Sequence, residues 1–488
     1  MASIEQGAEA RPGVLDLYRA AWHSGVQFVA HYRLAIAVEV GMVALWLALR
    51  TFSGVESRSY LLWTLTASAV ALVSPTSGLV ILAGTAPFYE PVTLSRALGL
   101  RHVLVGALGM SVALRLLFGG WRSMVWTAPV RLALALGIVT LLGVANTWRV
   151  FPADWAIHAT QTWLASIGGA MILLLVGVWV ARTGARRFVV AAVVAATVAV
   201  TLSLVEQLSR GSISTTRLEW IGFWKDFGPR LGGAIASPNA MAALAVMPVC
   251  VLTSVAVLGR GPLLGRGLVL RVACAAAAAV LFVAMYVTYS RAALLSLFGL
   301  VVVIAWRLNR RVGQLVFVVG IAAGVLLLPT YLQLRGQAGS LGAIEPGSFL
   351  VASDRDRITA WQTAIGMLRD QPLLGQGFLA YKQLGDTYGD PVLSSPHNEW
   401  LRLFAEEGVV GGVIGLLFVV TTLAWLAHGP GPLAAGILAG AAGYFTMATF
   451  NNPFLFVQVS AVVYPLLAVA LVSAADARHQ AAAKPAPL

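Results

Sequence analysis

The chain has 488 residues, of which 59% are hydrophobic and 11% are charged, and its mean hydropathy is +0.82. Soluble domains are about half apolar and about one quarter charged, so this composition excludes a soluble globular protein. The net charge is +13, but the arginines form short clusters between apolar runs instead of one basic stripe, which argues against a nucleic-acid partner. Cys250 and Cys274 lie within apolar runs, where neither a disulfide scaffold nor a zinc site is expected.

Apolar stretches follow one another along most of the chain. They cover residues 34–50, 59–74, 77–90, 101–119, 124–145, 157–181, 187–205, 237–258, 269–289, 292–306, 313–331, 408–427, 431–449 and 454–474. Because roughly 20 apolar residues cross a bilayer, they predict an all-α polytopic membrane protein with about 12 to 14 spans. The pieces between 59 and 90 are short and are separated by Ser74-Pro75, so they are either two tilted helices or one broken helix.

Arginine clusters in three short loops predict the orientation, because cytoplasmic loops carry an excess of basic residues. The clusters are Arg182, Arg186 and Arg187; Arg260, Arg266 and Arg271; and Arg307, Arg310 and Arg311. An even number of spans separates each cluster from the next, so all three loops and both termini are expected in the cytoplasm. The predicted segments are 1–33 (cytoplasmic), 34–331 (transmembrane bundle), 332–407 (long, partly helical periplasmic loop), 408–474 (C-terminal spans) and 475–488 (disordered cytoplasmic tail).

The segment 332–407 is the one long polar insertion, and such insertions are usually functional or disordered. Ser353 followed by Asp356 predicts a helix start with a capping box. Apolar residues then recur at helical spacing at Ile358, Trp361, Ile365 and Leu368. We therefore expect an amphipathic helix at the outer membrane interface, a break at 371–377, and a second helix beginning near Ser395.

Two arginines at the predicted outer end are candidates for anion binding. Arg291 lies between two apolar runs, where a guanidinium is costly without a partner, although an interfacial anchor that snorkels to the surface is the alternative. Arg230 lies in a Gly/Pro-rich loop, where it either binds a ligand or only adds solubility. Because the guanidinium fork donates paired hydrogen bonds, two arginines at the mouth of a cavity suit a phosphate or diphosphate.

His397 is the candidate proton acceptor. With Ser395 as N-cap and Pro396 as the first helical residue, His397 lies in the first helical turn, where the helix dipole disfavours the imidazolium form. A neutral imidazole can act as a general base. The alternative is a histidine that only makes a structural hydrogen bond. Glu406 and Glu407 either orient His397 or remain solvated.

These residues resemble the hallmark loop of the bacterial O-antigen ligase and O-antigen polymerase superfamily. The matching loop residues are Arg357, Trp361, Pro372-Leu373-Leu374-Gly375-Gln376-Gly377, His397-Asn398, Leu401, Glu406, Gly408 and Gly411-Gly412. Upstream, the elements at Arg230, Pro238-Asn239 and Ser290-Arg291 are similar to the same family. The resemblance covers residues from about 200 to about 470.

The resemblance implies a membrane glycosyltransferase of the GT-C-like type in the bacterial inner membrane, working on the periplasmic side without a cofactor or metal. Its donor is a glycan linked to undecaprenyl diphosphate. The acceptor hydroxyl attacks the anomeric carbon with inversion, and His397 accepts its proton. Arg230 and Arg291 hold the diphosphate, and Arg357 either joins them or braces the loop helix.

Three further residues have supporting roles in this expectation. Asn398 and Glu406 belong to the matching loop, and Trp400 stands beside the His-Asn step, where the family often carries a different aromatic residue or serine. A tryptophan at this position is expected to stack on a sugar face.

The acceptor is left open by these residues. A ligase transfers the glycan to lipid A core, a polymerase to another lipid-linked repeat, and an O-oligosaccharyltransferase to a protein, and all three share the donor and the base. A transporter or flippase is the alternative from another class. It is disfavoured because no inverted pair of broken helices is visible and the polar groups gather at one side of the membrane.

Overall fold

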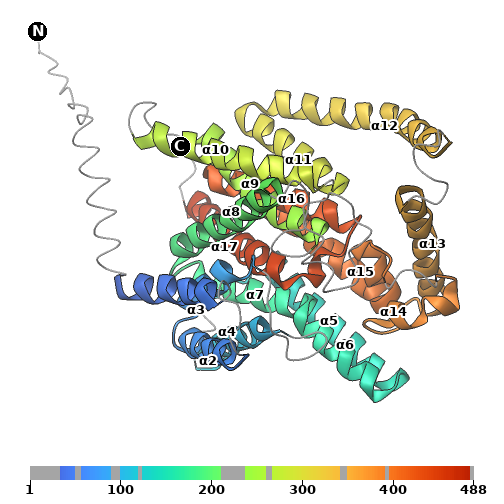
Figure 1. Ribbon diagram of the computed structural model, residues 1–488, viewed down its shortest axis with the longest axis horizontal. Coiled ribbons are helices and arrows are strands. Elements are labelled where there is room, and N and C mark those ends of the chain that lie inside the picture. The colour runs from blue at the N-terminus through green and yellow to red at the C-terminus, as the bar shows by residue number, and fades with distance from the viewer. Residues whose placement is uncertain are drawn as a thin grey trace, which may run out of the picture.

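The computed structural model describes residues 33–49, 57–88, 99–118, 124–209, 237–259, 266–288, 290–340, 349–390 and 395–483. Within these ranges the regular elements are helices and no strand occurs, which confirms the all-α class. After a helical segment at 33–49, the helices are α2 (Ser57–Val73), α3 (Pro75–Thr85), α4 (Leu100–Leu117), α5 (Ala128–Val150), α6 (Ala153–Ala165), α7 (Ile167–Val180), α8 (Ala185–Ser209), α9 (Pro238–Leu258), α10 (Arg266–Val287), α11 (Arg291–Leu308), α12 (Arg310–Ser340), α13 (Phe349–Asp370), α14 (Ala380–Leu384), α15 (Glu399–Leu426), α16 (Gly431–Ala448) and α17 (Val457–Ala483), with 3-10 turns η5 (Asp386–Tyr388) and η6 (Pro453–Leu455). Figure 1 shows α13 and α14 together at one end of the helical bundle.

Eight helical segments of the described residues are long and apolar enough to cross a membrane, so the chain is a multi-pass membrane protein. They are Ala128–Val150, Ala153–Val180, Ala185–Val205, Pro238–Leu258, Gly267–Val287, Glu399–Leu426, Gly431–Ala448 and Val457–Ala482. This number is below the expected range of about 12 to 14. Three apolar stretches form helices that are too short to count, at Arg58–Val73, Pro75–Thr85 and Leu295–Leu308.

A hydroxyl side chain followed by proline begins two of the buried helices. At the start of α3, Ser74 accepts a hydrogen bond from the backbone N–H of Ser77 at 3.3 Å, and Pro75 occupies the first helical position. Ser237 and Pro238 begin α9 in the same way. Proline suits this position because the first amide of a helix has no partner to lose. The stretch between 59 and 90 is therefore two helices.

Glycines allow α9, α11 and α16 to pack closely. A Cβ atom on Gly436 of α16 would lie 2.6 Å from the Cα atom of Val251 in α9. A Cβ atom on Gly443 would lie 2.8 Å from the Cβ atom of Ser296 in α11. Any larger residue would push these helices apart, as is typical of small residues at helix interfaces in membranes. The first turns of α11 therefore lie beside the last turns of α16.

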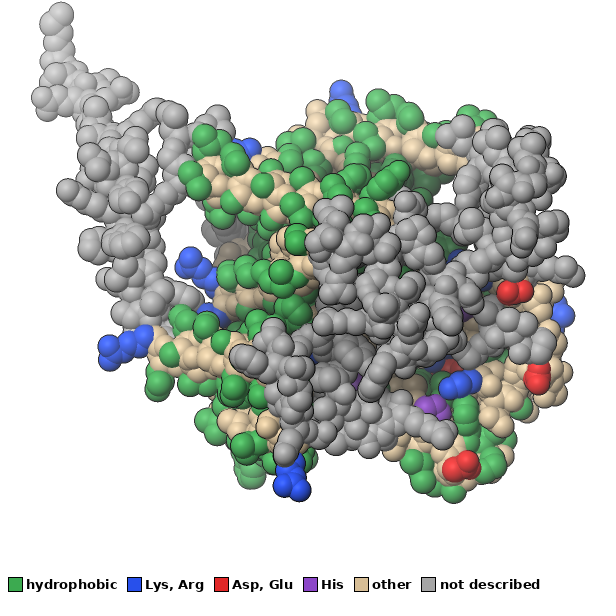
Figure 2. Space-filling view, in the orientation of Figure 1, with side chains coloured by type: hydrophobic (Ala, Val, Ile, Leu, Met, Phe, Trp, Pro, Cys, Tyr) green, Lys and Arg blue, Asp and Glu red, His purple; other side chains and the backbone are tan. Residues whose placement is uncertain are grey.

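Several basic residues lie at one end of the bundle. Three polar contacts join the turns at this end: Arg182 to Asp476 at 3.9 Å, Arg307 to the carbonyl of Gly429 at 2.9 Å, and Arg478 to His428 at 2.9 Å. The arginine clusters at 182–187 and 307–311 thus share one end, and the turn between α16 and α17 lies at the other. On the face shown in Figure 2, the visible acidic side chains lie toward the α13 to α15 side, and much of the remaining coloured surface is hydrophobic.

The helix in the long polar segment differs from the expectation in its start. α13 begins at Phe349, one turn before Ser353, because the residues before Ser353 already have helical backbone. The capping box predicted at Ser353 is therefore wrong. Ile358 and Ile365 are 55% and 39% exposed, while the buried residues of this helix include Ala360, Thr363, Ala364 and Met367. Two of the four residues of the apolar stripe thus face away from the protein, while Trp361 donates its indole N–H to the carbonyl of Pro396 at 3.0 Å. An amphipathic helix at the outer membrane interface stays a prediction.

Two helices extend beyond the predicted segment boundaries. α12 continues to Ser340, past the boundary expected at residue 331. α17 remains helical to Ala483, where a disordered tail was expected from residue 475. Alanine is the strongest helix former, and this stretch is rich in it, which explains the added turns. The residues after Ala483 lie outside the described ranges.

Candidate functional site

Backbone hydrogen bonds join the turn after α13 to a kink in α15. Gly408 has φ 66° and ψ −168° inside this helix, a conformation that glycine adopts far more readily than other residues. The kink removes the helical partners of nearby carbonyls and amides. The bonds that replace them run from Gln376 N–H to Ala405 O (3.1 Å), Gly377 N–H to Glu406 O (2.8 Å), Val409 N–H to Pro372 O (2.8 Å) and Val410 N–H to Leu373 O (3.4 Å). The turn at 372–377 thus fixes the first part of α15.

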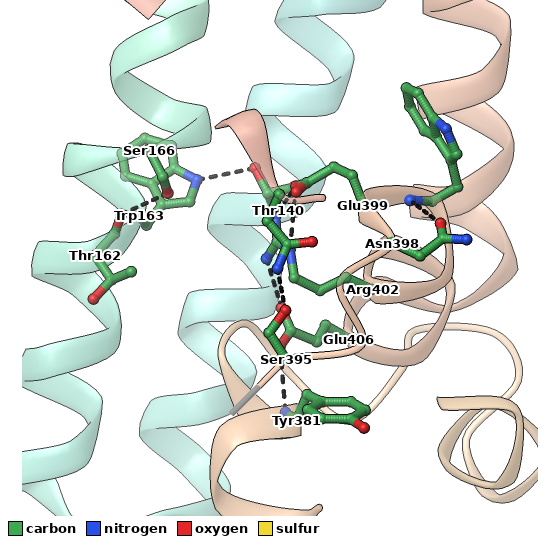
Figure 3. A network of polar contacts seen from close by, with 12 residues as sticks. Thr140, Thr162, Trp163, Ser166, Tyr381, Ser395, Asn398, Glu399, Arg402 and Glu406 are labelled. Carbon is green, nitrogen blue, oxygen red and sulfur yellow. Dashed lines mark hydrogen bonds and ion pairs between the residues drawn. The ribbon is translucent and has the colours of Figure 1, made fainter. Parts of the chain in front are cut away.

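A buried charged cluster lies on that first part of α15. Arg402 donates from Nε to Glu399 Oε1 at 3.1 Å and from Nη1 to Glu406 Oε2 at 2.8 Å, and all three side chains are at most 2% exposed. Figure 3 shows Arg402 between the two carboxylates, with Tyr381 on the far side of Glu406. The backbone N–H of Tyr381 donates to Glu406 Oε1 at 3.3 Å. The cluster therefore ties α14 to α15.

Glu406 and Glu407 are both buried, and neither contacts His397 in the described residues. Glu406 pairs with Arg402, not with His397, and it is buried instead of solvated. Glu407 packs against Gly143 of α5, where any Cβ atom would collide with its carboxylate. Because Arg402 stands four residues before Glu406, the pair uses the ordinary i,i+4 spacing of a helix. A role for either glutamate in orienting His397 has no direct contact to support it in the described residues.

His397 lies just before α15 and not in its first turn. The N-cap is Asn398, whose Oδ1 accepts from the backbone N–H groups of Trp400 and Leu401, both at 3.1 Å. His397 has φ 48°, in the left-handed region that is uncommon for residues other than glycine. The prediction that Ser395 caps the helix is therefore wrong. Ser395 instead uses its hydroxyl to accept the backbone N–H of His397 at 3.2 Å.

The surroundings of His397 keep its imidazole neutral. Burial, followed by the positive charge of Arg357, lowers the pKa of His397 to about 4, while the charge of Asp390 acts in the opposite direction. Asp390 in turn accepts a hydrogen bond from the hydroxyl of Tyr381 at 2.7 Å. The neutral form expected from the sequence is thus supported, but by burial and Arg357 instead of a helix dipole. A neutral imidazole near a carboxylate is the arrangement of a general base with a stabilising partner.

The three arginines predicted to bind diphosphate differ in where they lie: one is near His397, one begins α11, and one is outside the described residues. Arg357 lies on α13 and acts electrostatically on His397, so the two are neighbours. Arg291 is the first residue of α11, and the packing of Ser296 against Gly443 places that helix start at the end of the bundle where α16 finishes. Arg230 lies outside the described residues.

Trp400 is held by the corner between α16 and α17. Its indole Nε1 donates to Thr449 Oγ1 at 3.2 Å, and its ring meets that of Phe454 edge to face, with centroids 6.0 Å apart. The side chain is only partly buried. Its indole N–H is therefore engaged within the protein, and sugar stacking by Trp400 remains a prediction.

Sequence reasoning missed several residues of this site. Arg402 was detectable, because Glu399 and Glu406 lie three and four residues away on the same helix. Asp390 and Asn452 had no local signal, since their partners Tyr381 and Ser395 are brought to them by the fold. Among the described residues, no three His, Cys, Asp or Glu side chains gather in an arrangement that would hold a metal ion.

In the comparison with protein families, residues 275–416 match a family described as O-antigen ligase. The matched range begins within α10, ends within α15, and includes Arg291, Arg357 and the His397-Asn398 step. The match is narrower than the resemblance read from the sequence and does not reach Arg230. No curated protein matches the chain.

Proposed function

We propose that this chain, whose residues 275–416 form a domain of the O-antigen ligase family, is an inner-membrane glycosyltransferase that takes a glycan from undecaprenyl diphosphate. The observation that carries the proposal is His397, a neutral imidazole with Arg357 and Asp390 around it. It lies at the end of the bundle opposite the arginine clusters. A proton acceptor beside a guanidinium suits a reaction that deprotonates a hydroxyl and releases a phosphate.

In the proposed reaction, the oxygen of an acceptor sugar hydroxyl attacks the anomeric carbon of the lipid-linked glycan. The bond between that carbon and the diphosphate oxygen breaks, its electron pair leaves with the diphosphate, and the configuration inverts. His397 takes the proton of the attacking hydroxyl. Asp390 stabilises the imidazolium that forms and opposes part of the unfavourable effect of burial and of Arg357.

The leaving diphosphate needs cations at its oxygens. Arg357 is the described guanidinium near His397, and the start of α11 at Arg291 offers a helix N-terminus in addition to its side chain. Arg230 remains a third proposed ligand. Charge stabilisation of this kind acts on the transition state more than on the bound substrate. No general acid is required, because a diphosphate leaves readily.

The acceptor proposed first is lipid A core, which makes the protein an O-antigen ligase facing the periplasm. The test is glycan transfer by the purified chain in nanodiscs, with lipid-diphosphate-linked glycan and either lipid A core or a second lipid-linked repeat. His397→Ala should abolish transfer, since its base is lost. His428→Ala is the matched control, because His428 is exposed at the other end of the bundle.

Transfer to lipid A core by the wild type, lost in His397→Ala alone, supports the ligase. Elongation of the lipid-linked repeat instead makes the protein a polymerase with the same base. Transfer that survives His397→Ala contradicts the mechanism. If neither acceptor receives glycan, a protein acceptor is tested next. If the protein acceptor receives none either, the proposal of glycan transfer is contradicted.

A further inference from the structure

The corner between α16 and α17 contacts the segment that carries His397. Asn452, which is 6% exposed, donates from Nδ2 to the hydroxyl oxygen of Ser395. The same oxygen accepts the backbone N–H of His397 at 3.2 Å. The Ser395 hydroxyl thus connects Asn452, at the corner between α16 and α17, to the backbone of His397.

This corner is also tied to the start of α9. Asn239, the second residue of α9, donates from Nδ2 to Asn451 Oδ1 at 2.9 Å. Asn451 and Asn452 are neighbours in the chain, so one corner bonds to α9 on one side and to Ser395 on the other. Buried amides in a membrane protein are costly unless they find partners, and Asn452 Nδ2 and Asn451 Oδ1 find theirs on segments that are far apart in sequence.

The backbone of His397 requires such support. Its φ of 48° is unfavourable for a side chain with a Cβ atom, and residues of this kind persist where surrounding contacts fix them. A second contact acts on the preceding residue, since Trp361 Nε1 of α13 donates to the carbonyl of Pro396 at 3.0 Å. Without the bond at Ser395, the segment is free to relax toward an ordinary conformation and to turn the imidazole away.

We propose that Asn452 and Ser395 are positioning residues that hold His397 in its left-handed conformation. This inference rests on the proposed function, because the position matters for proton transfer to the imidazole. Asn452, Ser395 and His397 form a relay from the bundle to the base, and Asn451 with Asn239 anchors that relay to α9. A base displaced by a fraction of a hydrogen-bond length loses rate without losing substrate binding.

The kinetic test compares relay variants with a local control. Asn452→Leu keeps the branching and the number of heavy atoms of the side chain but removes the donor, and Ser395→Ala removes the shared hydroxyl. Thr446→Val is the control, because the Thr446 hydroxyl bonds only to the carbonyl of Ala442 in its own helix.

We expect kcat to fall about tenfold or more in both relay variants, with the donor KM changed less than about twofold. The double variant should be no slower than the slower single variant, because both break one relay. Ser395→Thr, which retains the hydroxyl, should recover most of kcat.

A second readout does not need catalysis. Diethyl pyrocarbonate modifies accessible neutral histidines, and mass spectrometry quantifies each histidine peptide. In the full chain in nanodiscs, His397 should react several times faster in Asn452→Leu and Ser395→Ala than in the wild type. His428 and His479, which are exposed at the other end, should react equally in all variants and serve as internal references.

The outcomes separate this proposal from the proposed function. A kcat equal to that of Thr446→Val, additive losses in the double variant, or unchanged reactivity of His397 overturns the relay. A wild type that transfers no glycan contradicts the proposed function, and the reactivity of His397 then still decides whether the relay holds it. If Asn452→Leu does not fold, Ser395→Ala alone decides, since Ser395 lies outside the helices.

Discussion

Val409 donates its backbone N–H to the carbonyl of Pro372 at 2.8 Å, so the second part of α15 begins on the turn that follows α13. The kink at Gly408 thereby divides α15 into two parts with different surroundings. Its first part carries the charged cluster and follows directly from His397, and its second part continues through the apolar bundle. The turn at 372–377 of the long polar segment is therefore hydrogen-bonded to the helix that begins just after His397.

Gly408→Ala should destabilise the protein by about 1–3 kcal/mol, because a Cβ atom there would collide with the carbonyl oxygen of Leu373 and φ is 66°. Gly389→Ala is the control, since Gly389 has φ 99° but a Cβ atom there would meet no other atom within 4 Å. Denaturant unfolding in detergent measures both. Equal losses in the two variants would mean that backbone strain, and not the joint with Leu373, sets the cost.

Removing Arg402 should be among the most destabilising single changes in the described part of the chain. Arg402→Met leaves Glu399 and Glu406 buried without their cation, which costs about 3–5 kcal/mol for a buried pair. Adding Glu399→Gln and Glu406→Gln to Arg402→Met should recover much of this loss. Thermal unfolding in nanodiscs measures the stability of each variant. Arg369→Met is the control, because Arg369 is exposed and its loss should change stability by no more than about 0.5 kcal/mol. A mild Arg402→Met phenotype would show that the carboxylates are not charged.

The pH dependence of transfer reports the environment of His397. Its pKa of about 4 predicts that kcat/KM stays level as pH falls from 7 to 5 and declines only near pH 4, where the base becomes protonated. Arg357→Gln removes a positive charge, raises the pKa of His397 and moves this decline to higher pH. Asp390→Asn removes a negative charge and moves it lower. Arg369→Gln, on the same helix as Arg357, is the control and should leave the pH of the decline unchanged. A decline of the wild-type kcat/KM near pH 6.5 would contradict a buried His397 as the base.

The parts of this fold that the sequence predicts well are those with local causes. The all-helical membrane architecture follows from long apolar stretches, and the break at Ser74-Pro75 follows from cap chemistry. The start of α15 was misplaced because Ser395-Pro396 and Asn398 are both good helix starts. In the structure the Ser395 hydroxyl bonds to Asn452 and to the backbone N–H of His397 instead of capping the helix, and no local pattern connects Asn452 to Ser395.

The buried face of α13 shows a second limit of local reasoning. The sequence pattern predicts an amphipathic helix with Ile358 and Ile365 on its apolar face, but it does not identify the residues that contact the rest of the protein. The structure buries Ala360, Ala364 and Met367 in one cluster with residues of α14 and α15, while Ile358 and Ile365 stay exposed. This contact face depends on partner helices that the local sequence does not contain.

The orientation of the bundle is testable without any assay of activity. The positive-inside rule predicts that the arginine-rich end lies in the cytoplasm and that His397 lies outside. Gln362 on α13 and Gln480 on α17 are both exposed and lie toward opposite ends. In a background with Cys250 and Cys274 replaced by alanine, a membrane-impermeant maleimide should label Gln362→Cys in intact spheroplasts, and should label Gln480→Cys only after permeabilisation. The reverse pattern would place the candidate base in the cytoplasm and contradict transfer on the periplasmic side.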